Sequence, residues 1–219
     1  MKTKKVVLIV VLCIVVLLIA IWGIREYALW NDGNLQKDNS MSREEVLELL
    51  KKGEEYPNYH VSFVGSNNEK YDIYVKDNVF VEYCNNEFRL REDYNTNEYI
   101  MIFKTADKEV AGVNNNLEKL EYQQGSMDYS IVNKLDYKYL GEKELDGRQV
   151  IYIQLKNGSA YTKFAIDKET GIIINRIDLS KAFIFTTNKN ESKRELKLDV
   201  VTDEDVARPD LSKYEVVEE

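Results

Sequence analysis

The chain opens with a continuous apolar stretch. Residues 6–24 carry no charged side chain, and as an α-helix rising about 1.5 Å per residue they would cross most of a bilayer core of about 30 Å. Three lysines precede the stretch, whereas the two charges that follow it, Arg25 and Glu26, cancel. Because basic flanks stay in the cytoplasm, the pattern predicts a cytoplasmic tip and signal anchor over residues 1–30, with the remaining chain extracytoplasmic in a single-pass arrangement at the cell membrane.

Two other kinds of N-terminal segment are alternatives to a permanent anchor. A cleaved signal peptide has a shorter apolar core and ends in small residues at a cleavage site, whereas this stretch ends with residues 20–24 as AIWGI. A lipoprotein signal places a cysteine at the end of the apolar stretch, whereas Cys13 lies in its middle. Trp30 suits the outer membrane interface. The sequence favours an uncleaved anchor, and cleavage near the end of the stretch stays an alternative.

A polar segment at residues 31–40 predicts a linker, and the periodicity then becomes helical over residues 42–52. Ser42 and Glu45 have the spacing of a capping box, in which each side chain satisfies the backbone N–H of the other residue. Gly53 follows two lysines, and the pattern predicts that it ends the helix in a left-handed conformation.

From Tyr59 onward, apolar residues recur with a period of two, as in Tyr71, Ile73 and Val75. This alternation is typical of half-buried antiparallel strands. Residue pairs that tolerate positive φ separate the apolar runs and predict hairpin turns. These pairs are Asp77-Asn78, Asn85-Asn86, Asp146-Gly147, Asn157-Gly158 and Thr170-Gly171. Their close spacing after Leu140 predicts a meander of consecutive hairpins.

Some of the predicted strands are apolar on both faces, so something must cover the second face. The predicted helix at 42–52 is one candidate, and a lumen that holds an apolar ligand is another. The second alternative assigns ligand binding on an apolar concave face to six residues taken from these strands: Ile100, Ile102, Val150, Tyr152, Ile172 and Ile174.

The alternation stops in two other parts of the chain. Residues 106–130 predict a long connection in which Leu117 and Leu120 have the spacing of a short helix. After Asp203 the tail is acidic, and its apolar positions Leu211, Tyr214, Val216 and Val217 are candidates for late packing.

The net charge of the chain after residue 30 excludes some classes of binding partner. The chain has 38 acidic and 30 basic residues, and residues 1–30 hold four of the basic and one of the acidic ones, so the remainder carries a net charge of −11. Such a balance argues against nucleic-acid binding and against adhesion to anionic headgroups. Cys84 is the one cysteine outside the apolar stretch, so no intrachain disulfide is expected there.

The sequence shows no catalytic pattern. His60 is the single histidine, and although a pairing with Cys84 would resemble a nucleophile with its base, no family signature surrounds either residue. Acidic residues alternate along predicted strands without the glycine-centred loop of a calcium site. We therefore expect no catalytic site, no metal site and no cofactor, and the protein is predicted not to be an enzyme.

Three segments in the second half of the chain resemble a known family. They are YLGE at 139–142, DGRQVIYIQL at 146–155 and FAIDKETG at 164–171, and YHVSF at 59–63 after the predicted helix looks like the family's start. Together they resemble the LolA/LolB/RseB superfamily of outer-membrane lipoprotein carrier-like envelope proteins. The resemblance covers about residues 42–205, and its Firmicute branch includes sporulation and germination lipoproteins of the GerS type.

The resemblance implies a mainly β fold with some α, in which a curved antiparallel sheet forms an unclosed β-barrel around one or two helices over residues 41–219. It also implies non-enzymatic binding. The favoured hypothesis is a membrane-anchored protein that docks an envelope protein partner, with a role in sporulation or spore germination. The alternatives are a lipid or lipoprotein acyl chain on the concave face, and an RseB-like envelope-stress sensor. Exposed strand edges would also allow a homodimer.

Overall fold

The computed structural model describes residues 2–31, 40–65, 67–105, 107–117, 132, 134–182 and 185–218. Within these residues the helices are α1 (Lys2–Asn31) and α2 (Arg43–Glu54). The first six strands are β1 (Asn58–Val64), β2 (Lys70–Lys76), β3 (Val79–Cys84), β4 (Glu87–Asp93), β5 (Glu98–Lys104) and β6 (Glu109–Asn114). The other six are β7 (Asp136–Leu145), β8 (Arg148–Asn157), β9 (Ala160–Asp167), β10 (Ile173–Ala182), β11 (Phe185–Leu198) and β12 (Glu215–Glu218).

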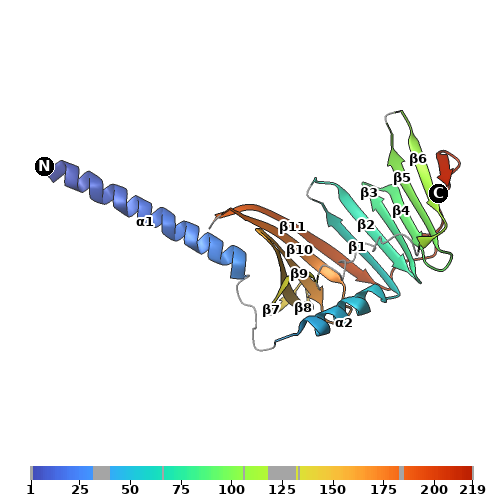
Figure 1. Ribbon diagram of the computed structural model, residues 1–219, viewed down its shortest axis with the longest axis horizontal. Helices are drawn as coiled ribbons and strands as arrows, with labels where there is room; N and C mark the ends of the chain where they lie inside the picture. The colour runs from blue at the N-terminus through green and yellow to red at the C-terminus, as the bar shows by residue number, and fades with distance from the viewer. Residues whose placement is uncertain are drawn as a thin grey trace.

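These strands form one curved, unclosed sheet in the order β12-β6-β5-β4-β3-β2-β1-β11-β10-β9-β8-β7 (Figure 1). Neighbours that follow each other in the chain pair antiparallel, as the alternation predicted. The two halves meet where β1 pairs antiparallel with β11. The final strand was not predicted, because β12 pairs parallel with β6 and makes the sheet mixed. The predicted fold class, a mainly β protein with an unclosed barrel after an apolar helix, is confirmed.

Helix α1 extends away from the sheet (Figure 1). Its segment Val6–Tyr27 is long and apolar enough to cross a membrane, and the apolar side chains along it are exposed. Near the end of this segment, the carboxylate of Glu26 accepts hydrogen bonds from Thr186 at the start of β11, from N at 3.2 Å and from Oγ1 at 2.5 Å. The predicted linker falls almost entirely on residues 32–39, outside the described residues.

Helix α2 begins as predicted. Glu45 N donates to Ser42 Oγ at 3.2 Å, and Ser42 N donates to Glu45 Oε2 at 2.6 Å, which completes the capping box. The predicted end was wrong, because Gly53 lies inside the helix, which continues to Glu54. The reason for a glycine here is a close approach: a Cβ at position 53 would lie 2.6 Å from the carbonyl carbon of Gly171.

All five predicted hairpin turns are present between consecutive strands. Asp77-Asn78 and Asn85-Asn86 have positive φ at both residues, between 48° and 66°. Positive φ also occurs at Asp146-Gly147, at Gly158 and at Gly171, which has φ +81°. Asp, Asn and Gly tolerate this left-handed backbone better than other residues do. Their positions therefore fix where each turn forms, and the turn sets the register of its hairpin.

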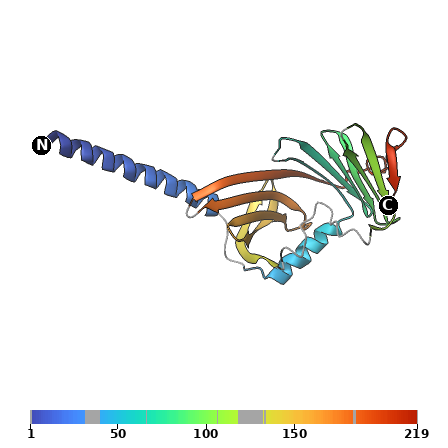
Figure 2. The same cartoon turned by 45° about the horizontal axis from the view of Figure 1, so that its top comes forward.

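The sheet arches over α2, which lies beneath the half made of β7 to β10 (Figure 2). Val46 and Leu50 of α2 pack against alternate residues of β8 and β9, among them Ile151, Ile153 and Ile166, all of them buried. On the other half of the sheet, the tail after β11 covers part of β3 to β6: Val206 and Leu211 are buried there, whereas Val216 and Val217 are exposed. The helix predicted at Leu117 and Leu120 lies outside the described residues, except for Leu117, which is buried.

Candidate functional site

The structure distributes the six predicted ligand-binding residues over three packed clusters. Val150, Tyr152 and Ile174 pack with Leu140 and Ala165. Ile100 and Ile102 lie under the C-terminal tail, in contact with a cluster that includes Leu211, and Ile172 packs with Val61 and Ile73. Among the described residues, Ile102 and Ile174 line two different hollows, which are described below. Ligand binding by these six residues stays a prediction.

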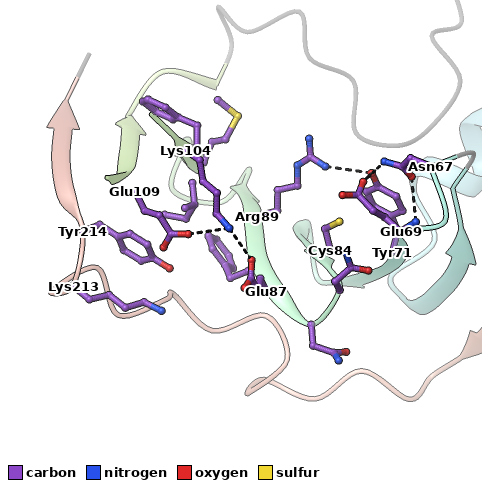
Figure 3. A pocket seen from close by; sticks show the side chains of 16 residues that line it. Asn67, Glu69, Tyr71, Cys84, Glu87, Arg89, Lys104, Glu109, Lys213 and Tyr214 are labelled. Carbon is purple, nitrogen blue, oxygen red and sulfur yellow. Dashed lines mark hydrogen bonds and ion pairs between the residues drawn. The ribbon is translucent and has the colours of Figure 1, made fainter. Parts of the chain in front are cut away.

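A hollow of about 780 Å³ lies along the ends of β2 to β6, beside the C-terminal tail (Figure 3). We call it the aromatic hollow, because Tyr71, Phe88, Phe103 and Tyr214 line it together with Met101, Ile102 and Cys84. Met101 and Phe103 come from β5, point to the face opposite Ile100, and stay 36% and 40% exposed. The period of two that buries Ile100 therefore presents these two large apolar side chains to solvent.

Three cations and three carboxylates also line the aromatic hollow. On one side, Lys104 Nζ lies 3.4 Å from Glu87 Oε2 and 3.3 Å from Glu109 Oε1 (Figure 3). Hydrogen bonding to Glu109, followed by the charge of Glu87, raises the pKa of Lys104. Lys213, from the tail, lies 4.9 Å from the ring centroid of Tyr214.

The other side is organised around Tyr71. Its hydroxyl donates to Glu69 Oε2 at 2.9 Å, and Arg89 NH1 donates to the same hydroxyl at 3.4 Å. Burial, followed by the bond to Glu69, raises the pKa of Tyr71. Arg89 also lies 5.9 Å from the Tyr71 ring centroid and 3.7 Å from Glu82 Oε1. The charges around the hollow are therefore largely paired, while its apolar surface stays open.

Tyr71 also forms a wall between this hollow and a second one. Its ring stacks on that of Phe63 in β1, with centroids 5.1 Å apart and planes at 12°. Arg194 of β11 pairs directly opposite Phe63, and its guanidinium carbon lies 5.0 Å from the Phe63 centroid. The second hollow, of about 540 Å³, lies on this side, and we call it the Arg194 hollow.

Of the two residues considered for catalysis, His60 has structural partners. His60 Nε2 lies 3.0 Å from Asp72 Oδ1, and its ring stacks on Tyr74 with centroids 4.5 Å apart. Cys84 instead lines the aromatic hollow on β3. Within the part of the chain that the structure describes, no group of three or more His, Cys, Asp or Glu side chains is placed to hold a metal ion. The groups that line the two hollows can bind a ligand through apolar contact and paired charges.

Sequence reasoning missed Arg89, Phe103 and Arg194 as site residues. A signal for Arg194 was present: in β11, Glu191, Lys193, Glu195 and Lys197 alternate on an exposed face. Arg194 falls between them, so a period of two turns it to the face of its less polar neighbours. Phe103 carried no comparable signal, because the sequence does not state that the tail covers the opposite face of β5.

The fold itself has known counterparts. No protein-family model matches the sequence, and no curated protein is significantly similar to it. An uncharacterised conserved protein from Thermus thermophilus shares the fold. That solved structure has a TM-score of 0.53 and 15% identity, and the match covers 82% of this chain and all of that one. At this identity the likeness concerns the fold alone.

Two further solved structures are similar at a lower level. One is Pseudomonas aeruginosa MucB in its complex with MucA, with a TM-score of 0.43, 11% identity and coverage of 76% of this chain and 61% of that one. The other is the lipoprotein LppX of Mycobacterium tuberculosis, with a TM-score of 0.41, 11% identity and coverage of 74% and 99%. Nothing about partners or ligands is carried over from either protein to this chain.

Proposed function

We propose that this protein is a membrane-tethered, non-enzymatic binding module that docks an extended segment of an envelope protein in the aromatic hollow. The observation that carries this proposal is the exposure of Met101 and Phe103 inside a hollow of about 780 Å³. Large apolar side chains gathered in a concave site mark binding surfaces, whereas isolated ones do not.

The charges of the hollow define the chemistry of the partner. Because Lys104, Arg89 and Lys213 are balanced by three carboxylates, the hollow favours neither sign of charge. A segment with alternating apolar and charged side chains of both signs would satisfy these groups, and an extended backbone would suit the ends of β2 to β6. Aromatic rings in such a site supply much of the contact energy in protein recognition.

The apolar helix α1 supports a fixed site of action. A permanent anchor keeps the binding domain within reach of the membrane surface, which suits the recruitment of a partner better than the delivery of a cargo. A role in sporulation or germination and an RseB-like sensor role rest on the sequence resemblance, and both stay predictions. A homodimer through an exposed strand edge also stays a prediction.

Photo-crosslinking in living cells tests this proposal. A photoreactive phenylalanine analogue replaces Phe103 in the full-length chain, and in a matched control it replaces Val200, which is 51% exposed and lies outside the hollow. We expect a discrete protein adduct from position 103 that is absent from position 200. Lys104→Glu should reduce that adduct several-fold, because it turns a paired cation into a third negative charge beside Glu87 and Glu109.

Two outcomes would contradict the docking of a protein. Equal yields of protein adduct from positions 103 and 200 would show that the hollow has no special affinity for a protein partner. An adduct found only in the lipid fraction would instead support the acyl-chain alternative.

A further inference from the structure

Arg194 is a cation without an anionic partner among the described residues. Its Nε atom is buried and has no hydrogen-bond partner there, and its guanidinium contacts the face of Phe63 instead. Burial, followed by the charge of Arg176, lowers the pKa of Arg194 to about 10. The guanidinium therefore stays charged at neutral pH, and leaving such a group unpaired is costly.

The other cations of the Arg194 hollow are already paired. Lys70 Nζ lies 2.8 Å from Asp72 Oδ2, Arg148 NH1 lies 2.6 Å from Asp167 Oδ2, and Lys193 Nζ lies 2.8 Å from Asp146 Oδ2. Each of these pairs neutralises one cation of the hollow. Among the described residues that line the hollow, Arg194 is thus the cation left without a carboxylate partner, in a domain whose overall balance is strongly acidic.

The two carboxylates that line the same hollow do not neutralise Arg194. Asp146 is bound to Lys193, and Glu195 Oε1 lies 3.0 Å from Lys197 Nζ. Both carboxylate side chains are more than 60% exposed, so they lie toward solvent at the rim. A dianionic ligand would be repelled by these rim charges more strongly than a monoanion.

Apolar side chains flank the guanidinium. Phe63 lies under it, and Ile174 and Leu196 line the hollow beside it. A guanidinium presents a planar fork that binds a carboxylate with two parallel hydrogen bonds. The surrounding chemistry therefore matches a single negative charge that is joined to an aliphatic body.

We propose that the Arg194 hollow binds the carboxylate of an aliphatic acid, with its chain against Phe63, Ile174 and Leu196. This site is separate from the aromatic hollow, because the stacked Phe63 and Tyr71 rings lie between the two. It does not depend on the docking of a protein segment. Binding supplies Arg194 with an anionic partner, which the described residues do not provide, and so stabilises the folded domain.

The test is calorimetric titration of the full-length protein in phosphatidylcholine nanodiscs with decanoate, with empty nanodiscs as the blank. Wild type should bind one decanoate saturably, and decanoate should raise its thermal unfolding midpoint. Arg194→Gln should weaken binding by about 10- to 100-fold, the range for loss of a charged hydrogen bond. Lys193→Gln, which removes a paired cation of the same hollow, should weaken it by less than about fivefold.

Two ligand controls separate the parts of the proposed ligand. Decanol keeps the chain without the charge, and acetate keeps the charge without the chain, so both should bind more weakly than decanoate. The proposal is overturned if Arg194→Gln binds decanoate as wild type does, if decanol or acetate binds as tightly, or if decyl phosphate binds in preference to decanoate.

The variants also separate loss of binding from loss of folding. Arg194→Met removes an unpaired charge, so without ligand its unfolding midpoint should equal or exceed that of wild type. If Arg194→Met fails to fold, Arg194→Lys decides the question, because it keeps the charge and loses the planar fork. Arg194→Lys should fold and bind decanoate about tenfold more weakly, and unchanged binding would overturn the proposal.

Discussion

Replacing Gly53 with alanine separates helix propensity from packing. Propensity predicts that the free energy of unfolding rises, whereas packing predicts that it falls. Alanine is favoured over glycine inside a helix by up to about 1 kcal/mol. In this structure, however, the new Cβ would lie 2.6 Å from the carbonyl carbon of Gly171. The carbonyl oxygen of Gly171 would lie closer still, and an ordinary contact is at least 3.4 Å, so α2 would have to move by about 1 Å from the turn between β9 and β10.

The cost of this movement exceeds the gain in propensity. Overpacking of a well-packed interior costs about 1–3 kcal/mol, and here the obstacle is backbone that no side-chain rotation relieves. Moving α2 also disturbs Val46 and Leu50, which are buried against β8 and β9. We therefore expect Gly53→Ala to lower the free energy of unfolding by about 1–2 kcal/mol net of propensity.

Urea unfolding of the full-length protein in detergent micelles measures this change in the free energy of unfolding. The near-ultraviolet circular dichroism of the tyrosines monitors the transition. The control is Lys51→Ala on the exposed face of the same helix, which should change the free energy of unfolding by no more than about 0.5 kcal/mol. A Gly53→Ala protein as stable as wild type, or more stable, would refute the close approach of α2 to Gly171.

Four further predictions concern the core, the buried carboxylate, alkaline pH and the aromatic hollow. Leu50→Ala should lower the free energy of unfolding by about 2–4 kcal/mol in the same assay, because it leaves a cavity under the sheet. Asp167→Ala should cost about 2–3 kcal/mol, because Arg148 and the N–H of Glu169 lose their acceptor, and the less costly Asp167→Asn is the comparison. Burial raises the pKa of Tyr59 to about 12, whereas an unfolded tyrosine ionises near 10, so stability should fall as pH rises from 10 to 12. Tyr59→Phe should make that slope shallower without removing it, because burial also raises the pKa values of Tyr137 and Tyr139 to about 12. An unchanged slope would contradict the assignment. Phe103→Ser should change the free energy of unfolding by no more than about 0.5 kcal/mol in urea. The same substitution should abolish the protein adducts that form from a photoreactive residue placed at Met101. A large loss of stability would mean that Phe103 belongs to the core.

The local parts of the fold were predictable because their causes are local. Each hairpin turn needs residues that tolerate positive φ, and pairs such as Asp77-Asn78 state this within two positions. The start of α2 was predictable for the same reason, since Ser42 and Glu45 satisfy each other's backbone groups within one turn.

Features that depend on distant segments were not predictable. Gly53 looked like a helix stop, but the reason for this glycine is the backbone of Gly171, more than 100 residues away. The parallel pairing of β12 with β6 brings together the tail and the middle of the chain, and no local pattern announces it.

The candidate site was predictable only in part, for a related reason. A period of two places Tyr99, Met101 and Phe103 on one face of β5, but the pattern does not say which face the tail covers. Strands that are apolar on both faces carry no sign of which side is open. The structure supplies this information, because Ile100 is fully buried whereas Phe103 is 40% exposed.

The junction between the two halves of the sheet has a consequence for the order of folding. Val61 of β1 pairs with Leu196 of β11, so the first strand to be synthesised finds its second neighbour only when nearly the last strand has been made. Long-range pairings of this kind slow folding and prolong the exposure of unpaired strand edges. During synthesis, the outer edge of β1 therefore stays unpaired until β11 has been made, and in this interval the nascent domain is most open to chaperones, proteases and aggregation.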